Sequence, residues 1–255
     1  MLNIKDEQLV VNHIMNKGKL AGIKHCNVFT DFLTLYEQNL FLERKHELNN
    51  IHYAFYGGYD DSERKIIAFY PDYMQKNDLI YPIDAISIYP KNAKFSNKLT
   101  HRDYLGSILG LGITRAKVGD ILVKENRAIA FVNHTIASYI QMNLNLVKQT
   151  VVTVEQLDAV PLEIIKPQYK DIQGTVPSVR LDAVIGLAFP LSRAKAAALI
   201  KSKTVYVNSR LILSSSYQLA EGDIVSVRGM GKFLLDNIGN RTKKDRILIV
   251  VKRYT

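Results

Sequence analysis

Cysteine, tryptophan and long apolar runs are scarce or missing in this chain of 255 residues. The single cysteine, Cys26, excludes an intramolecular disulfide framework and is typical of a reducing compartment. No apolar run approaches the roughly 18 residues that a membrane-spanning helix needs. The N-terminal sequence MLNIKDEQLV lacks the basic start and the apolar stretch of a secretory signal. We therefore expect a cytoplasmic protein without membrane insertion.

Acidic residues are scarce in the C-terminal third of the chain. Residues 177–255 contain 14 Lys and Arg but only 5 Asp and Glu. The whole chain has 34 basic and 24 acidic residues. The first 176 residues therefore contain 20 basic and 19 acidic residues and are almost neutral. The basic residues are set into a foldable pattern. This favours a folded module that binds nucleic acid over a disordered basic arm.

The N-terminal segment predicts a small α/β unit that ends near residue 80. Apolar residues at helical spacing indicate that residues 1–50 are mostly helical, with Thr30-Asp31 capping a helix over Phe32–Leu40. Aromatic and β-branched residues predict strands over Ile51–Tyr56 and Ile66–Tyr70. Gly57-Gly58 ends the first of these strands.

The middle segment, residues 81–165, predicts the order β-α-β-β-α-β of a ferredoxin-like unit, which RNA-recognition-motif (RRM) domains share. The six elements are expected over Ile83–Tyr89, His101–Leu111, Asp120–Val123, Ala128–Val132, Asn133–Met142 and Val147–Val154. Tyr89 and Phe131 are the only candidates for base-stacking aromatics on the central strands. Topology alone does not make this segment an RNA binder.

A polar stretch with Pro and Gly, Lys166–Pro177, predicts a linker before the basic module. In the module, Ser178 is expected to cap a helix over Val179–Ala188, and Ser192 a helix over Arg193–Ser202. Strands are then predicted over Thr204–Val207, Ile224–Arg228 and Ile247–Val251, with a turn at Asn208-Ser209. The predicted fold class is α+β with three small domains, over residues 1–80, 81–165 and 177–255.

Basic side chains flank the two helices of this module. The apolar stripes that would pack the helices are Leu181, Val184, Ile185 and Ala188 on the first, and Ala194, Ala197, Ala198 and Leu199 on the second. Short helices joined by a tight turn would place guanidinium and ammonium groups on one surface, beside helix N-termini that also bind phosphate. The candidate RNA-binding residues are Arg180, Arg193, Lys195, Lys201, Lys203, Arg210, Arg228 and Lys232. A solvated charged face is the alternative.

The segment SVRLDAVIGLAFPLSRAKAAALIKSKTVYVN, followed by LAEGDIVSVRGMGKF, resembles a known RNA-binding domain. That domain is named after small-subunit ribosomal protein S-four and is also called the alpha-L motif. The resemblance implies that the two helices and the adjacent hairpin grip structured RNA. By this resemblance, the best contact candidates are Arg180, Arg193, Lys195 and Arg210.

Three further segments indicate which family of proteins with this domain the chain resembles. They are GGYDDSERKIIAFYP, HRDYLGSILGLGITRAKVGDI, and SVRGMGKF followed by TKKDRI. Together they are similar to the YlmH family over essentially the full length. The resemblance implies a bacterial cytoplasmic protein with an N-terminal domain, an RRM-like middle domain and the RNA-binding domain. It also implies association with the large ribosomal subunit and a link to the rescue of stalled nascent chains. The family's gene neighbourhood connects it to cell division.

Catalytic interpretations of the middle segment fail on spacing. His101-Arg102-Asp103 matches part of the protein-kinase catalytic loop, but Ile108 stands where that loop needs Asn. The same triplet is similar to the nucleophile motif of pseudouridine synthases, without its Leu. Gly110-Leu-Gly112 lacks the third Gly of a dinucleotide fingerprint. We expect Asp103 or Thr100 to cap the helix instead, and no catalytic residue is assigned.

Metal and cofactor sites are not predicted either. Asp60, Asp61 and Glu63 have no fixed ligand spacing, and Arg64 beside them could neutralise their charge, so a solvated turn is expected. His25-Cys26 has no second pair of ligands for zinc. His134 at a helix start is expected at the surface or in a cap.

The sequence therefore predicts a non-catalytic RNA-binding protein. The family resemblance implies that its partners are ribosomal RNA of the large subunit, tRNA or peptidyl-tRNA, and ribosomal proteins, in quality control of stalled nascent chains. Binding would combine phosphate neutralisation with shape readout of RNA. Two alternatives stay open: an RNA-modifying enzyme that uses the basic module as a substrate anchor, with Asp103 and Arg102 as its site, and a cell-division-linked adaptor at an anionic membrane.

Overall fold

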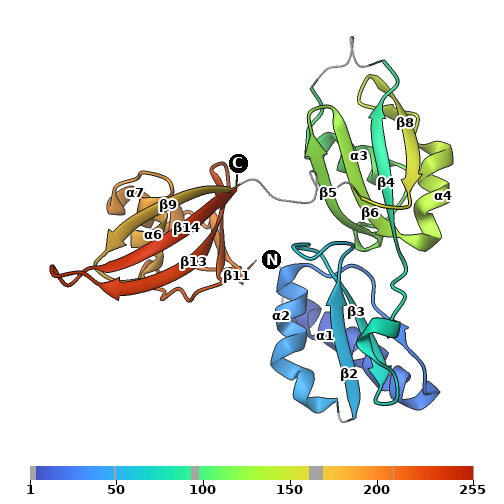
Figure 1. Cartoon of the computed structure of the whole chain (residues 1–255), viewed down its shortest axis with the longest axis horizontal. Helices are drawn as coiled ribbons and strands as arrows, with labels where there is room; N and C mark the ends of the chain where they lie inside the picture. Colours follow the sequence, from blue (N-terminus) through green and yellow to red (C-terminus); the bar gives the residue numbers. More distant parts are fainter. Residues whose placement is uncertain (1–3, 49, 93–97, 161–168, 209, 255) are drawn as a thin grey trace. The chain divides into compact units, whose positions relative to one another are not determined.

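The computed structural model describes residues 4–48, 50–92, 98–160, 169–208 and 210–254. They fold into two compact units, residues 1–166 and 167–255 (Figure 1). The described part of the first unit contains a three-stranded and a five-stranded sheet, and that of the second unit contains a six-stranded sheet. The predicted mixture of helices and sheets is therefore confirmed. A division of the first unit at residue 80 stays a prediction.

The N-terminal part of the first unit packs two helices on a small antiparallel sheet of order β1-β3-β2. Its elements are α1 (Ile4–Lys24), β1 (Val28–Phe29), α2 (Leu35–Arg44), the 3₁₀ turn η1 (Lys45–Glu47), β2 (Ile51–Tyr56), β3 (Ile66–Pro71) and the 3₁₀ turn η2 (Lys76–Asp78). The helices bury Ile14 and Phe41 against Phe69 of β3. β2 spans the predicted residues, and β3 runs one residue beyond its predicted end.

The cap predicted at Thr30-Asp31 is wrong. Helix α2 begins later, and Thr34 caps it in a reciprocal box with Glu37. The hydroxyl of Thr30 instead accepts a hydrogen bond from the backbone N–H of Ile67, at 2.9 Å. Thr30 is therefore recruited to the sheet, where it satisfies a buried backbone donor.

The middle part alternates helices and strands, as predicted. Its elements are β4 (Ile83–Pro90), α3 (His101–Gly110), the 3₁₀ turn η4 (Arg115–Lys117), β5 (Val118–Lys124), β6 (Arg127–Asn133), α4 (His134–Asn143), β7 (Leu146–Val147) and β8 (Thr150–Leu157). The strand order is β5-β6-β4-β8-β7, and each neighbouring pair is antiparallel. The strand predicted over Val147–Val154 is instead a hairpin, because the chain turns at Lys148, whose φ is +54°.

The two faces of this five-stranded sheet have different partners. Helices α3 and α4 cover one face, which buries Ile86, Ile88 and Ala130 (Figure 1). The opposite face carries Ile129 and Phe131, and it packs against Phe32 and Ile66 of the N-terminal part. The N-terminal and middle parts of the first unit therefore share a core.

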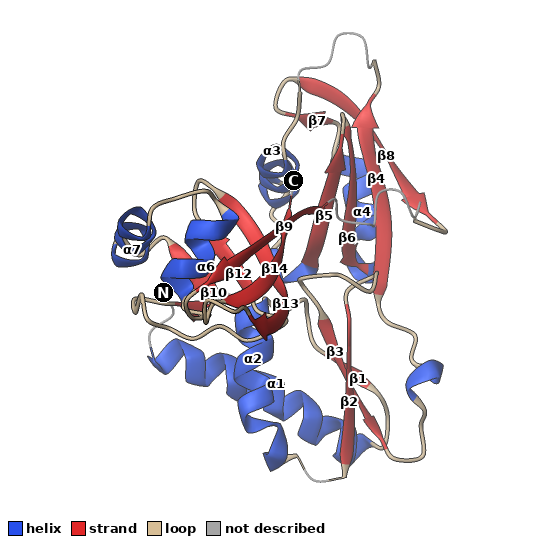
Figure 2. Ribbon diagram, turned by 60° about the vertical axis from the view of Figure 1, so that its left-hand side comes forward, coloured by secondary structure: helices blue, strands red, loops and turns tan. Residues whose placement is uncertain are grey.

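The second unit is one antiparallel sheet of order β11-β10-β12-β13-β14-β9, with two helices on one face (Figure 2). Its elements are β9 (Tyr169–Val176), α6 (Leu181–Ala188), α7 (Arg193–Lys201), β10 (Val205–Val207), β11 (Arg210–Leu211), β12 (Ile224–Val227), β13 (Gly231–Arg241) and β14 (Ile247–Tyr254). The core between helices and sheet buries Leu181, Ile185, Val225 and Phe233.

The linker predicted over Lys166–Pro177 is wrong for the residues that the structure describes. Residues 169–176 form β9, which pairs with β14 along its whole length, from Ile247↔Val176 to Tyr254↔Tyr169. Backbone hydrogen bonds to β14 define this edge strand, so it needs little apolar patterning. Residues 166–168 lie outside the described residues, as does Ser209 of the predicted turn.

The helix boundaries of the basic module are partly corrected. Helix α6 begins two residues later than predicted, with Arg180 in place of Ser178 at the N-cap, because Val179 accepts a backbone hydrogen bond from Leu219 in an extended segment. Ser192 caps α7 as predicted and accepts from the N–H of Lys195. The predicted apolar stripe of α7 is wrong in part. Ala196 and Ile200 are the buried residues of this helix. Of the predicted residues, Leu199 packs against the core, whereas Ala194 and Ala198 are exposed.

Within the described residues, no single helix is long and apolar enough to cross a membrane. Helices α6 and α7 meet the length and composition criteria only as a pair, and they are bent by 114° relative to each other. Both contribute buried residues to the core beneath the six-stranded sheet.

Candidate nucleic-acid interface

A buried carboxylate gathers two arginines at the start of the helix pair. Arg180 donates to both oxygens of Asp182, with Nε–Oδ1 at 3.1 Å and Nη2–Oδ2 at 3.2 Å. Arg193, at the first position of α7, donates from Nη2 to the same Oδ2 at 3.0 Å. Asp182, the last residue of the Arg-Leu-Asp motif, therefore binds Arg180 of the same motif and Arg193 of the later Ser-Arg motif. We call these three residues the Asp182 cluster.

The Asp182 cluster holds the two guanidinium groups in fixed positions. Burial alone would raise the pKa of Asp182, but hydrogen bonds from Arg180 and Arg193 outweigh it and lower the pKa. The carboxylate therefore stays ionised and neutralises one of the two positive charges. The side chain of Arg193 remains 56% exposed, whereas that of Arg180 is 33% exposed and bound through two nitrogens. Arg193 is thus the better placed to reach a phosphate, and Arg180 supports the carboxylate that positions it.

We expect Asp182→Asn to loosen this arrangement without removing a cation. The variant should lose about 1–3 kcal/mol of stability in the C-terminal unit, because hydrogen bonds to a charged group are lost. Hydrogen exchange of the α6 and α7 amides at neutral pH measures this loss.

The pH dependence of this loss has a definite sign. Because the folded pKa of Asp182 lies below its ordinary value of 3.8, the stabilisation is present above that value and disappears as the pH falls through the folded pKa. Calorimetry of the full chain from pH 7 downward should show the two proteins converge. A constant difference at every pH would contradict the role of the ionised carboxylate.

The remaining basic residues of the helix pair are exposed. Lys195 lies in the first turn of α7, and Lys201 in its last turn. Lys203 follows in a left-handed conformation, with φ of +62°. Arg210 is exposed on the edge strand β11, opposite Val207. The structure therefore brings Arg180 and Arg193 together, places Lys195 in the same helical turn as Arg193, and puts Arg210 on a strand.

Arg228 and Lys232 belong to the other face of the C-terminal sheet. The strand register places Tyr206, Ser226 and Lys232 in one row, and side chains alternate with the buried valines that face the helices. Arg228 stacks on the Tyr206 ring, at 5.0 Å from its centroid, and Lys232 lies 4.4 Å from the centroid of Tyr254. The eight predicted RNA-binding residues therefore do not form a single surface. The sequence pointed to Arg228 and Lys232 but not to Tyr206 and Tyr254, because residues from different strands build this face.

The two candidate base-stacking aromatics of the middle part, Phe131 and Tyr89, are poorly placed for that role. Phe131 is 1% exposed and packs on Tyr59, with ring centroids 5.1 Å apart. The N-terminal part thus covers the centre of this sheet face. Tyr89 is half-buried, and its hydroxyl donates to Glu155 at 2.5 Å while Arg127 lies over its ring at 5.3 Å.

The His101-Arg102-Asp103 motif serves as a helix cap, as predicted. The carboxylate of Asp103 accepts from the backbone N–H of Thr100 at 2.8 Å and from its hydroxyl at 2.7 Å. Lys148 adds an ion pair at 2.9 Å. These interactions, led by the one from Lys148, lower the pKa of Asp103 to about 2. Such a strongly paired carboxylate is a poor proton acceptor near neutral pH.

The acidic loop after β2 is organised around a carboxylate from the middle part. Asp120 accepts from the Tyr59 hydroxyl at 2.9 Å and from the backbone N–H groups of Glu63 and Arg64 at 2.6 and 3.1 Å. The guanidinium of Arg64 donates to the carbonyls of Val118 and Phe32. It also interacts electrostatically with the neighbouring Glu63, as the expected neutralisation requires. Among the described residues, no group of three or more His, Cys, Asp or Glu could hold a metal ion.

His134 lies at the surface, as expected, at the start of α4. Its Nδ1 lies 2.8 Å from a carboxylate oxygen of Asp84 on β4, and the imidazole is 70% exposed. The cap of α4 is the neighbouring Asn133, which accepts from the backbone N–H of Thr135.

Two family models match the regions just described. Residues 80–160 match a model described as a putative RNA-binding domain in YlmH, and residues 179–225 match the S4 domain. A curated Bacillus subtilis (strain 168) protein, ribosome-associated protein quality control protein P2, is 31% identical over 252 residues. That alignment covers 98% of this chain and 96% of the relative. The chain belongs to the YlmH family.

The Asp182 cluster of this YlmH-family protein lies within the matched S4 domain, an RNA-binding domain of the alpha-L type. The resemblance to this domain is thereby confirmed over residues 179–225. A solved structure, described as cell division protein ylmH from Streptococcus pneumoniae, is 26% identical and has a TM-score of 0.48. It covers 62% of the YlmH-family chain and 93% of its own.

Proposed function

We propose that this protein is a non-catalytic RNA-binding factor. It docks its S4 domain on structured ribosomal RNA or tRNA of the large ribosomal subunit and acts in quality control of stalled nascent chains. The observation that carries the proposal is the Asp182 cluster, which fixes an exposed Arg193 at the start of α7. The name of the Bacillus subtilis relative, a ribosome-associated quality control protein, supports the setting.

The mechanism is phosphate neutralisation by a preformed surface. Arg193 offers a guanidinium whose position is already fixed, so little side-chain entropy is lost when it meets a phosphate. Lys195 adds a point charge from the same turn, and the α7 N-terminus adds backbone N–H groups. Because A-form RNA hides its major-groove base edges, such contacts read the shape of the helix and not its sequence.

The sheet face with Arg228 and Lys232 provides a second set of cations. We assign it to a neighbouring part of the same RNA, since cations stacked on tyrosines suit both phosphates and exposed bases. The middle part, with its strand order β5-β6-β4-β8 and two helices on one face, supports a ferredoxin-like, RRM-like assignment. Its covered central face disfavours the usual base-stacking mode, so we expect it to contact RNA backbone or ribosomal protein in the cytoplasm.

Crosslinking the protein to RNA in cells and sequencing the attached RNA tests this proposal. We expect large-subunit ribosomal RNA and tRNA to be enriched, and the purified protein to sediment with large subunits but not with anionic liposomes. Enrichment of unrelated RNA would contradict the ribosomal role, and sedimentation with liposomes alone would favour the adaptor alternative. A change in the mass of the bound RNA would favour the enzyme alternative.

A further inference from the structure

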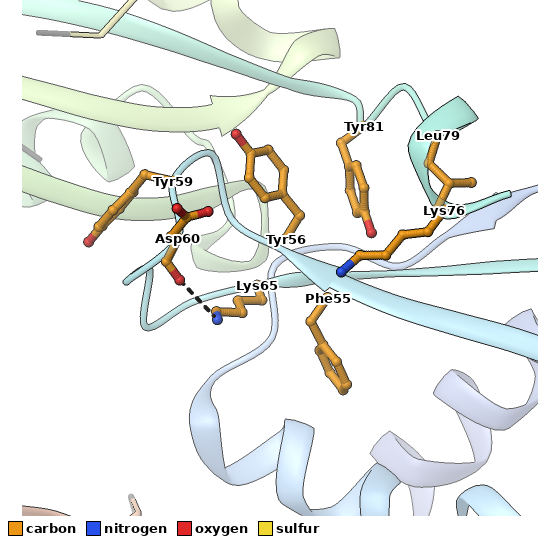
Figure 3. Close-up of a pocket in the computed structure, with 8 residues that line it drawn as sticks. All are labelled: Phe55, Tyr56, Tyr59, Asp60, Lys65, Lys76, Leu79 and Tyr81. Carbon is orange, nitrogen blue, oxygen red and sulfur yellow. Dashed lines mark hydrogen bonds between the residues drawn. The ribbon is translucent and has the colours of Figure 1, made fainter. Parts of the chain in front are cut away.

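A cavity of about 450 Å³ lies in the first unit, beside β2 and η2 (Figure 3). Three tyrosines, two lysines and one aspartate supply its polar lining: Tyr56, Tyr59, Tyr81, Lys65, Lys76 and Asp60. Figure 3 shows the Tyr56 and Tyr81 rings next to each other, with centroids 5.2 Å apart. The Tyr81 hydroxyl points toward the side that Lys76 lines. The cavity thus combines aromatic surface with ammonium groups, outside the S4 domain.

The loop that walls this cavity is held in place. Tyr59 and the following residues are fixed by the carboxylate of Asp120, which accepts three hydrogen bonds from them. The hydroxyl of Tyr56 donates to the carbonyl of Gly58 at 2.8 Å, which ties the strand end to the same loop. The aromatic wall is therefore formed before any ligand binds, which lowers the entropy cost of binding.

Two buried polar atoms in this region have no partner. In the part of the chain that the structure describes, the Tyr81 hydroxyl and the Ser62 hydroxyl are the buried side-chain atoms without a hydrogen bond. Tyr81 lines the cavity, and Ser62 lies in the loop that walls it. Burial raises the pKa of Tyr81 to about 12, so the group is a neutral donor at physiological pH. Because both hydroxyl oxygens are fully buried, they are unsatisfied within the fold and neither faces a ligand in the cavity.

The charges of the cavity favour an anion. Lys76 is exposed at the rim of the cavity. Lys65 donates to the backbone carbonyl of Asp60, at 3.4 Å. Because a carbonyl is neutral, this contact leaves the positive charge of Lys65 uncompensated. Asp60 carries the only carboxylate of the lining residues and stands on the loop side, where it suits a donor such as a ribose hydroxyl. Aromatic surface, two ammonium groups and one carboxylate together match a base, a phosphate and a sugar.

We propose that this cavity binds a nucleoside 5′-phosphate, taken either as a free mononucleotide or as one unstacked nucleotide of single-stranded RNA. The base lies on the exposed surface of Tyr56, Lys65 and Lys76 bind the phosphate, and the Asp60 carboxylate accepts from a sugar hydroxyl. The N-terminal part would thus bind this ligand by itself, and the binding does not depend on RNA binding by the S4 domain.

Titration of the full chain with AMP, followed by saturation-transfer NMR and calorimetry, tests the cavity. Tyr56→Leu should weaken AMP binding about 10-fold, because one base–aromatic stack is lost. Lys76→Gln should weaken it and reduce its salt dependence. The matched controls are Tyr139→Leu, which replaces a 48% exposed tyrosine on α4, and Lys24→Gln at the end of α1. Both controls should bind AMP like the unmodified protein.

A single-stranded oligoadenylate distinguishes the two sources of the ligand. Tight binding of AMP indicates a free mononucleotide, whereas binding of the oligonucleotide alone, lost in Tyr56→Leu, indicates a strand of RNA. Adenosine and inorganic phosphate each bind more weakly than AMP if both halves of the ligand are recognised. Binding that is equal in Tyr56→Leu and Tyr139→Leu, or absent for AMP and oligonucleotide alike, overturns the proposal. The S4-domain variant Arg193→Gln should keep AMP binding, so failure of the two proposals can be told apart.

Discussion

Gly58→Ala should destabilise the first unit by about 2–6 kcal/mol, the sum of two costs. The backbone at Gly58 has φ of +102°, a conformation that a residue with a Cβ adopts only under strain, at about 1–3 kcal/mol. A Cβ there would also overlap the ring of Phe131, which is 1% exposed and has no room to retreat, and such overpacking costs a further ~1–3 kcal/mol. Loss of amide protection in β3 and β6, measured by hydrogen exchange on the full chain, reports the effect.

Gly106→Ala is the matched control for this prediction. Gly106 lies inside α3, and a Cβ at this position meets nothing within 4 Å. Alanine is the better helix former, so we expect stabilisation of about 0.5–1 kcal/mol. Equal protection in the two alanine variants would show that the loop after β2 is not locked onto the middle sheet.

The double substitution Arg193→Gln and Lys195→Gln should weaken RNA binding about 10- to 100-fold at 0.1 M salt, because two phosphate contacts are lost. Both side chains are exposed, and Arg180 keeps its two hydrogen bonds to Asp182 in the variant. The buried carboxylate therefore retains a partner, which makes this a cleaner test than removing both arginines. Fluorescence anisotropy with a labelled fragment of structured ribosomal RNA measures the change.

A charge-matched control separates a specific surface from general attraction. Lys24→Gln with Lys124→Gln removes the same net charge from exposed positions of the first unit. We expect its affinity for the RNA to change less than threefold. If this control and the Arg193 variant lose equal affinity, the total charge of the chain governs binding and the Asp182 cluster has no special role.

The helix pair of the S4 domain was predictable because its signals are local. A capping serine at Ser192 and an apolar stripe on α6 define two helices without reference to the rest of the chain. The motif also pointed to Arg180 and Arg193 as candidates. It could not reveal that Asp182 joins them, because the contact depends on the angle between the helices and spans eleven residues of sequence.

Two strands that depend on pairing with neighbouring strands could not be predicted from the sequence. β9 reads as a linker because its residues YKDIQGTV are mostly polar, and only the pairing with β14 makes it a strand. β13 contains Gly231, Asp236 and Gly239, which are residues typical of turns, yet it spans eleven residues between β12 and β14. Tertiary context overrides local propensity in both cases.

Phe131 illustrates a limit of a different kind. Its place on a central strand fits a base-stacking role in an RRM-like sheet, and nothing in the local sequence opposes it. The structure buries it because residues from 29 to 66 pack on the same face of the sheet. Contacts between distant segments of one unit are outside the reach of periodicity and spacing.

The dependence of RNA affinity on salt concentration tests the central claim most directly. If the S4 domain neutralises roughly five phosphates through a fixed set of cations, the logarithm of the association constant should fall with the logarithm of salt concentration with a slope of order −3 to −5. In the variant that lacks Arg193 and Lys195, the slope should be smaller by about 2. A slope near zero for the unmodified protein, or an unchanged slope in the variant, would contradict binding through the Asp182 cluster.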